Sequence, residues 1–238
     1  MARRKQSSKK QLEQRARKLV VSANPRSVVS EQFRTLRSNI TFSAVDKELK
    51  TILVTSALPG DGKSTVSANL ATLFAQDGKR VLFIDADMRK PTVQYTFSLT
   101  NAAGLSSVLT QQRLAGEVIR ESEISPNLHI LTSGPIPPNP AELLGSRSMT
   151  VLMNEMAQQY DLIVFDAPPV LSVTDAQILA NKVDGTLLVV NTGITEKENV
   201  EKAKELLGNA QARILGAVMN NFEMDKDQNY YQYYGTEE

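Results

Sequence analysis

The sequence predicts an α/β fold, an open and mostly parallel sheet with helices on both faces. Short β-branched apolar runs alternate along the chain with segments of helical period, which is the pattern of parallel strands joined by crossover helices. A length of 238 residues fits one hydrophobic core with appended segments. With 41% hydrophobic and 22% charged residues, the chain is neither low-complexity nor wholly disordered.

Six apolar runs are predicted to be the strands of this sheet. They are Thr51–Ser56, Arg80–Asp85, Leu128–Thr132, Leu162–Asp166, Thr186–Asn191 and Arg213–Met219. All are far shorter than the roughly 20 apolar residues that span a bilayer, so we expect a soluble, unsecreted protein. A ligand of such a sheet is expected beyond the carboxyl ends of the strands.

Helices are predicted before and between the strands. One covers about Val28–Ser43, a second about Lys63–Gln76, and a third starts near Thr195. In the second, Val66, Leu70, Leu73 and Phe74 repeat at the spacing of one helix face. The proline-rich stretch Ser133–Pro140 cannot donate a regular ladder and is expected to be a loop.

The composition excludes several kinds of site. The chain has no cysteine, which rules out disulfides, thiolate metal sites and cysteine nucleophiles. Its one histidine, His129, cannot build a histidine zinc site by itself. Chemistry must therefore rest on carboxylates, hydroxyls, amides and lysine or arginine.

The N-terminus is strongly basic although the whole chain carries a net charge of only +1. Residues 1–18 contain eight Lys or Arg and one acid, so this segment carries +7 and the remainder −6. We expect residues 1–24 to form a flexible basic arm that either only aids solubility or is drawn to anionic lipid. Nucleic acid is the weaker alternative, because the body of the chain offers no second basic patch.

The segment Ala57–Thr65, ALPGDGKST, has the features of a phosphate-binding loop. It lies between a predicted strand and a predicted helix, where glycines let backbone N–H groups turn toward phosphate oxygens. The residues expected to bind ATP are Gly60, Asp61, Gly62, Lys63, Ser64 and Thr65. The strict pattern requires glycine where this chain has Ala57, and the alternative is a chance turn.

Two further strands end in acids. Asp85 and Asp87 follow one strand, and Asp166 ends another. Each could be a helix cap or a turn acid, but together they gather carboxylates at the edge where the loop lies. Because Mg²⁺ prefers oxygen ligands, we expect it to bind at this edge, with the hydroxyl of Ser64 as one ligand.

The C-terminal segment 223–238 is acidic and rich in tyrosine. Four of the six tyrosines are Tyr230, Tyr231, Tyr233 and Tyr234, and acids lie on both sides of them. The segment lacks aliphatic partners, so we expect a flexible, exposed tail. The tail is either a partner-binding segment or a set of hydroxyls that accept phosphate.

With these features together, the chain resembles the bacterial tyrosine kinases, in particular the cytoplasmic catalytic subunits associated with capsule or exopolysaccharide synthesis. The resemblance runs from about Pro25 to the C-terminus, and it implies a kinase domain over residues 25–222. Ala57–Thr65 is similar to the Walker A motif of the family, Val81–Pro91 to its Walker A′ and Leu162–Pro169 to its Walker B. The fold implied is that of a P-loop NTPase of the deviant Walker A, partitioning-ATPase-like branch, and this family tolerates a residue other than glycine at position 57.

The resemblance also implies an oligomer. Glu31, Arg34 and Arg37 match the oligomerisation motif of the family, and Ser133–Leu144 is similar to another family segment. The implied assembly is a ring in which each subunit presents its tyrosine tail to the site of a neighbour. Asn220 is implied to contact adenine, with a plain turn residue as the alternative.

The implied reaction is ATP-dependent phosphorylation of tyrosine, on the tail and on exogenous substrates such as enzymes of sugar-nucleotide metabolism. The catalytic residues implied are Lys63, Asp85, Asp87 and Asp166. Asp85 is the expected proton acceptor, and Asp87 and Asp166 are expected to hold Mg²⁺ together with Ser64, although Asp85 and Asp87 can exchange roles. A transmembrane modulator is the implied partner, placing the cytoplasmic protein at the inner face of the cell membrane.

Two other functions remain open from the sequence. One is a positioning or partitioning ATPase that switches partners without phosphorylating protein. Members of that group usually carry an early lysine in the loop, where this chain has Leu58, and they lack a terminal tyrosine cluster. The other is a nucleotide-binding regulatory subunit whose tail is phosphorylated by a different kinase.

Overall fold

The computed structural model describes residues 16–43 and 48–222 and contains a seven-stranded sheet. The strands lie in the order β3-β4-β2-β5-β1-β6-β7. Their bounds are β1 Thr51–Ser56, β2 Val81–Asp85, β3 Arg120–Ser122, β4 Ser125–Leu131, β5 Leu162–Asp166, β6 Gly185–Asn191 and β7 Ile214–Asn220. Every pairing is parallel except that of β3 with β4, which confirms an open and mostly parallel sheet.

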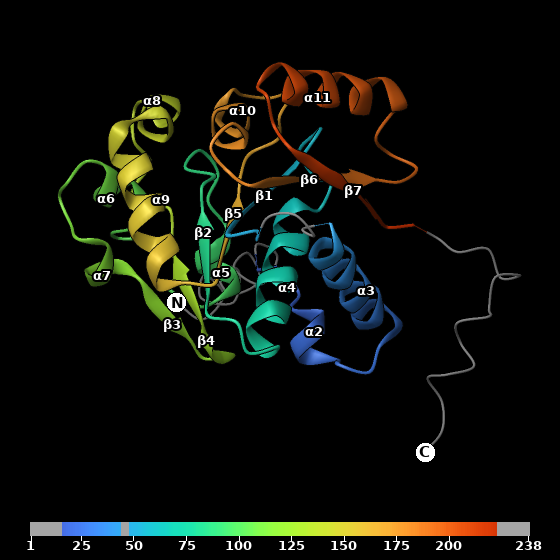
Figure 1. The fold of residues 1–238 in the computed structure, drawn as a ribbon, viewed down its shortest axis with the longest axis horizontal. Helices are drawn as coiled ribbons and strands as arrows, with labels where there is room; N and C mark the ends of the chain where they lie inside the picture. The colour runs from blue at the N-terminus through green and yellow to red at the C-terminus, as the bar shows by residue number, and fades with distance from the viewer. Residues whose placement is uncertain (1–15, 44–47, 223–238) are drawn as a thin grey trace, which may run out of the picture.

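Helices cover both faces of the sheet. In Figure 1, α11 lies on one side of β6 and β7, and α3 and α4 lie on the other. The helices are α2 Val20–Ala23, α3 Val28–Phe42, α4 Lys63–Gln76, α5 Val93–Thr96, α6 Leu105–Leu109, α7 Ala115–Val118, α8 Pro140–Gly145, α9 Arg147–Gln159, α10 Asp175–Ala180 and α11 Lys197–Asn209. None of the described helices combines the length and the apolarity that crossing a bilayer requires.

Two hydrophobic clusters, one on each face, form the core. Helix α4 packs on one face, where Val66, Leu70 and Phe74 meet apolar side chains of the central strands. On the other face the cluster includes Met149, Met156 and other apolar residues of α6, α8, α9, α10 and α11. Because strands β1, β2, β5 and β6 are buried along their whole length, they read in the sequence as continuous apolar runs.

The predicted helix Lys63–Gln76 has the same bounds in the structure, and most predicted strands shift by one residue or not at all. Two strand ends differ from the predicted bounds. Strand β4 begins at Ser125 instead of Leu128, and Asn220 is the last residue of β7 instead of following it. Strand β3 was not predicted, because its three residues are an edge segment without an apolar pattern.

The N-terminal arm predicted to reach residue 24 is shorter in the structure. Residues 16–24 include α2, in which Val21 is 1% exposed. The side-chain amide of Asn69 in α4 donates to the carbonyl of Lys18 at 2.8 Å, and its oxygen accepts from the N–H of Val21 at 3.1 Å. These contacts attach the segment to the body. The remainder of the predicted arm and the tyrosine tail lie outside the described residues.

Candidate active site

Strand register brings the predicted acids together. In the pairing of β2 with β5, Asp85 stands opposite Asp166, and in the pairing of β1 with β5, Asp166 stands opposite Val54. All three strands run parallel, so their carboxyl ends meet at one edge of the sheet. The loop after β1 leaves from this same edge, and the acids therefore lie beside the predicted phosphate loop.

The phosphate loop is shaped by backbone that favours glycine. Gly60 and Gly62 have φ values of +94° and +97°, in the left-handed region. At Gly62 a Cβ atom would also come within 2.1 Å of the side-chain nitrogen of Asn220. Helix α4 begins at the next residue, Lys63, so the amino end of a 14-residue helix faces the loop.

Asp61 holds the loop from inside rather than facing outward. Its side chain is 2% exposed and accepts from the N–H of Leu58 at 3.0 Å and from the hydroxyl of Thr195 at 2.6 Å. Asn220 donates from its amide to the carbonyl of Asp61 at 2.9 Å. Hydrogen bonds from two distant parts of the chain thus fix the loop before any ligand arrives.

Lys63 lies among the carboxylates. Its Nζ is 3.1 Å from Oδ2 of Asp87, 3.7 Å from Oδ1 of Asp166 and 3.3 Å from the hydroxyl oxygen of Ser64. Burial alone would lower the pKa of Lys63, but the charges of Asp166 and Asp87 outweigh it and raise the pKa. The lysine therefore stays charged and balances part of the negative charge at this edge.

Asp85 and Asp166 are almost fully buried and differ in their contacts. Asp85 accepts from the N–H of Asp87 at 3.2 Å, of Thr92 at 3.2 Å and of Val93 at 3.1 Å. Burial, followed by the neighbouring Asp166, raises its pKa to about 8. Burial also raises the pKa of Asp166, against the opposing effect of Lys63. Among the described residues neither carboxylate oxygen of Asp166 accepts a hydrogen bond of ordinary geometry, although the hydroxyls of Ser64 and Ser67 lie near enough to oppose the rise in its pKa.

An ion pair next to Asp87, between the exposed Arg89 and the buried Asp175, was not anticipated from the sequence. Arg89 donates from Nε and Nη2 to the two carboxylate oxygens of Asp175, both at 2.9 Å. Asp175 is fully buried at the start of α10, so the pair ties the loop after β2 to the segment after β5. The two partners are 86 positions apart, and no sequence pattern connects them.

The predicted oligomerisation residues lie on α3, away from these acids. Glu31 and Arg34 form an ion pair with each other, and Arg34 also donates to the carbonyl of Pro25 at 2.8 Å. Arg37 pairs with Asp77 at 2.9 Å, at the end of α4. Their role in assembly stays a prediction, and so does the contact of Asn220 with adenine.

Comparisons with known proteins agree with this geometry. A family model described as an AAA domain matches residues 49–215. The chain is 50% identical over 222 residues to the tyrosine-protein kinase YwqD of Bacillus subtilis, covering 93% of each chain. It is 45% identical over 219 residues to the putative tyrosine-protein kinase CapB of Staphylococcus aureus, covering 92% of this chain and 96% of that one.

Solved structures show the same fold. The chimerical protein CapA2B2 superposes with a TM-score of 0.83 at 43% identity, covering 88% of this chain and 93% of that chain. The cell division ATPase MinD of Pyrococcus furiosus superposes with a TM-score of 0.63 at 24% identity, covering 74% of each chain. The fold is thus the predicted P-loop fold of the partitioning-ATPase-like branch.

Proposed function

The chain belongs to the bacterial tyrosine-protein kinases, and from this premise we propose that it phosphorylates its own C-terminal tyrosines between copies and thereby regulates capsule or exopolysaccharide synthesis. It is a nucleotide-binding kinase of the P-loop type. The observation that carries the proposal is the position of Lys63, at the start of α4 and between Asp87 and Asp166. A lysine there reaches both the phosphates of a bound nucleotide and the carboxylates that handle metal and proton.

In this proposal, separate groups of the site bind the phosphates, neutralise charge and accept the proton. The amides of residues 60–65 and the amino end of α4 bind the phosphates of ATP, and Lys63 neutralises charge on the transferring group. The tyrosine oxygen forms a bond to the γ-phosphorus while the bond to the β,γ-bridging oxygen breaks and ADP leaves. The phenolic proton passes to a carboxylate of the site.

Asp85 is proposed as the proton acceptor. A phenol has a pKa near ~10, and an acceptor works best when its own pKa is not far below. The raised pKa of Asp85, about 8, lies closer to that of the phenol than the pKa of an ordinary carboxyl does, but Asp85 accepts the proton only in its ionised form, which without nucleotide predominates above about pH 8. Asp87 is the alternative, because its Oδ2 accepts from Lys63 and, among the residues that the structure describes, its Oδ1 accepts one hydrogen bond, from the N–H of Lys90.

The residues at this edge fit Mg²⁺. Hard oxygen ligands come from the buried carboxylate of Asp166, from Asp87 and from the hydroxyl of Ser64. Within the described residues no group of three acidic or histidine side chains is close enough to hold a metal unaided, so phosphates and water would complete the coordination. When bound, Mg²⁺ would neutralise charge on the phosphates.

The proposed acceptors are Tyr230, Tyr231, Tyr233 and Tyr234 of a neighbouring subunit. Glu31, Arg34 and Arg37 are proposed to join subunits into a ring, and each added phosphate brings about −1.5 to −2 charges to a tail that already contains acids. We expect the unphosphorylated form to assemble and the phosphorylated form to dissociate. A variant with all four tyrosines changed to Phe should then stay assembled after Mg-ATP, measured by size-exclusion chromatography with light scattering.

A membrane modulator and exogenous substrates in sugar-nucleotide metabolism are the proposed partners. They would place this kinase at the inner face of the cell membrane. Support comes from the family resemblance and from a related solved protein, CapA2B2, that is itself chimerical. The isolated protein is then expected to be a weak kinase that a modulator segment stimulates.

Mass spectrometry of the tail after incubation with Mg-ATP tests the proposal. Wild type should gain phosphate at residues 230–234, and Lys63→Met should lose the labelling. Lys182→Met is the matched control, because that lysine donates to the hydroxyl of Thr150 on another part of the surface. A tail that never labels while ATP hydrolysis continues would instead support the partitioning-type ATPase switch.

A further inference from the structure

An ion pair joins two of the loops that surround the site, and neither partner belongs to the proposed catalytic or metal-binding residues. Arg89 lies in the loop 86–92, two positions after Asp87. Its Nε and Nη2 donate to the two carboxylate oxygens of Asp175, both at 2.9 Å. The side chain of Asp175 is fully buried, whereas that of Arg89 is 40% exposed. A two-pronged contact of this kind fixes the orientation of the guanidinium as well as its distance.

Asp175 is a firm anchor, because its segment is bound to the strand that leads into the phosphate loop. The N–H of Val170 donates to the carbonyl of Ser56, at the end of β1, at 2.8 Å. Asp175 itself is the first residue of α10, a helix whose apolar side chains belong to the core. The segment 167–175 is therefore held in place with β1 and the phosphate loop.

The loop after β2 is attached less firmly, although it carries Asp87. The N–H of Ala86 donates to the carbonyl of Asp166 at 2.9 Å and holds the first residue of the loop. Beyond it, Oδ1 of Asp87 accepts from the N–H of Lys90 at 3.0 Å, a bond within the loop itself. In the described part of the chain, backbone bonds thus shape residues 87–92 but do not fix them against the segments that follow β1 and β5.

Two side chains make that connection instead. Among the described residues, Lys63 reaches from α4 to Asp87, and Arg89 reaches from the loop to Asp175. In the proposed function Lys63 serves the phosphates of ATP, which draws it away from Asp87. The pair of Arg89 and Asp175 then remains as the ion pair that holds the loop beside Asp166.

We propose that Arg89 is a positioning residue for the phosphoryl transfer. Through Asp175 it keeps Asp87 and Asp166 at the spacing that suits one Mg²⁺ while Lys63 is on the phosphates. The inference rests on the proposed function, because it takes Asp87 and Asp166 as the carboxylates that bind the metal. Groups that orient a metal ligand without touching the metal typically change metal affinity or activity by about 10–100-fold.

The geometry of the pair requires an arginine. A lysine ammonium is a point charge and cannot hold both oxygens of Asp175 in one plane, as the fork of Arg89 does. Stability alone makes no such demand, since the attraction within a buried ion pair is offset by the cost of taking the charges out of water. Arg89→Lys should therefore keep the charge and lose the positioning.

Binding of ADP with and without Mg²⁺ tests the inference without phosphoryl transfer. Isothermal titration calorimetry on the full chain compares EDTA with saturating Mg²⁺. We expect Arg89→Lys and Asp175→Asn to bind ADP like wild type in EDTA. With Mg²⁺ they should bind it about tenfold more weakly than wild type does, because the metal ligands are no longer held in place. Equal weakening in both conditions would overturn the inference, because a general structural role predicts that result.

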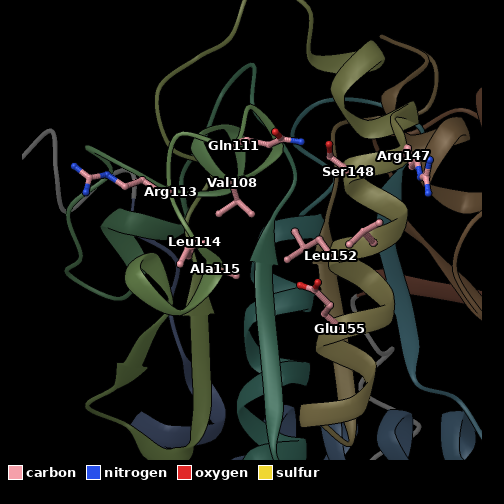
Figure 2. A pocket seen from close by; sticks show the side chains of 10 residues that line it. Val108, Gln111, Arg113, Leu114, Ala115, Arg147, Ser148, Leu152 and Glu155 are labelled. Atoms are coloured by element: carbon pink, nitrogen blue, oxygen red, sulfur yellow. The ribbon is translucent and has the colours of Figure 1, made fainter.

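Arg147→Met is the matched control. Figure 2 shows Arg147 at the start of α9, on the margin of a hollow of about 690 Å³ between α9 and the α6–α7 segment. This arginine forms no ion pair with any residue in the described part of the chain. Its replacement should leave the affinity for ADP unchanged in EDTA and with Mg²⁺.

The double variant Arg89→Met, Asp175→Asn separates positioning from folding. It removes both charges, so no buried carboxylate is left unpaired, and it should unfold at a higher temperature than Arg89→Met alone. The weaker binding of ADP with Mg²⁺ should persist in the double variant. A double variant with the wild-type response to Mg²⁺ would contradict the inference, because the unpaired charge would then explain the single variant.

Tail phosphorylation separates this inference from the proposed function. Asp175→Asn should need about tenfold more Mg²⁺ than wild type for half of its maximal rate. If wild type labels the tail and this variant responds to Mg²⁺ like wild type here and in the ADP titrations, the Arg89 inference fails and the kinase proposal stands. If wild type never labels the tail, the kinase proposal fails, and the ADP titrations alone decide the role of Arg89.

Discussion

The phosphate loop and the carboxylate cluster share one edge of the sheet but are held in different ways. The loop is fixed by hydrogen bonds, through the side chains of Asp61, Thr195 and Asn220. The cluster depends on charge, because Lys63 lies between Asp87 and Asp166. The first region is therefore formed before a ligand binds, and the second is a balance of buried charges.

The difference shows which part of the site must respond to the nucleotide. The loop hydrogen bonds leave the backbone amides of residues 60–64 available, whereas the amide of Thr65 donates to the carbonyl of Gly62 at 3.0 Å. The side-chain bonds that hold the loop need not break when phosphates arrive. Lys63, in contrast, is already engaged by carboxylates that would also be needed for the metal. Binding of Mg-ATP must therefore redistribute charge in the cluster while the loop keeps its shape.

The largest expected effect comes from Asp166→Asn, which changes charge without changing size. Kinase activity should fall about 100-fold or more, because the variant lacks the buried carboxylate that is proposed to bind Mg²⁺ and that carries charge at the reacting centre. Stability without nucleotide should hold or rise, since burial already disfavours the charged form of Asp166. The measurement is tail phosphorylation together with thermal unfolding, with and without Mg-ATP.

Thermal unfolding supplies the sharper contrast for this variant. The free energy of unfolding of the wild type should rise by about 2.7 kcal/mol when Mg-ATP is present at one hundred times its dissociation constant. Asp166→Asn should lose the part of that gain that depends on Mg²⁺. Asp77→Asn, which removes an exposed carboxylate that pairs with Arg37, should behave like wild type. An unchanged Mg²⁺ response in Asp166→Asn would show that the cluster does not hold the metal.

A smaller effect is expected in the loop, from Asp61→Ala. The substitution removes the acceptor for the N–H of Leu58 and for the hydroxyl of Thr195. Leaving such groups unpaired costs about 1–3 kcal/mol of stability. We expect ADP to bind about tenfold more weakly, which corresponds to ~1.4 kcal/mol, and by the same factor with and without Mg²⁺. Isothermal titration calorimetry measures both conditions.

Thr195→Val tests the same region with one hydrogen bond. It should weaken ADP binding less than Asp61→Ala does, because the bond to Leu58 survives. Thr35→Val is the matched control, since that hydroxyl donates to a backbone carbonyl on exposed α3. If the Asp61 variant lost affinity only in the presence of Mg²⁺, the distinction between a hydrogen-bonded loop and a charge-balanced cluster would be wrong.

Local patterns in the sequence were enough to predict six of the seven strands and to gather the candidate acids at one edge of the sheet. A strand, a glycine loop and helix α4 are consecutive in the chain, and Asp85 and Asp166 end buried apolar strands. Parallel strands carry their C-terminal residues to one edge, so topology alone brought these acids together. The position of Lys63 between two carboxylates agrees with that expectation.

Contacts between distant residues could not be predicted in the same way. Thr195 is 134 positions from Asp61, and Asp175 is 86 positions from Arg89, so no local spacing connects either pair. Helix α9 is different, because Met149, Leu152, Met153 and Met156 repeat at helical spacing and are buried. That signal was present in the sequence, and only a search for a helix before β5 was needed to find it.

The smallest expected effect tests whether the cluster is a balance of charges even without ligand. Burial and Asp166 raise the pKa of Asp85 from 3.8 to about 8 in the folded protein. The folded state therefore binds a proton that the unfolded state releases above pH ~4. This contribution to stability is complete below that pH and is lost as pH rises through about 8.

Asp85→Asn cannot titrate, so its melting temperature relative to wild type should rise as pH increases from 5 to 8.5. A gain of about 2–4 °C corresponds to 1 kcal/mol for a chain of this length. The comparison concerns the slope with pH, because the loss of a hydrogen bond to the N–H of Asp87 offsets the curve equally at every pH. Measurements in EDTA without nucleotide keep metal out of the result.

Asp161→Asn is the matched control, because it removes an exposed carboxylate that also accepts a backbone N–H. The melting temperature of this variant should change with pH in parallel with that of wild type. If the Asp85 variant ran parallel as well, Asp85 would be charged in the folded protein, and the loop and the cluster would no longer differ in the way their contacts indicate.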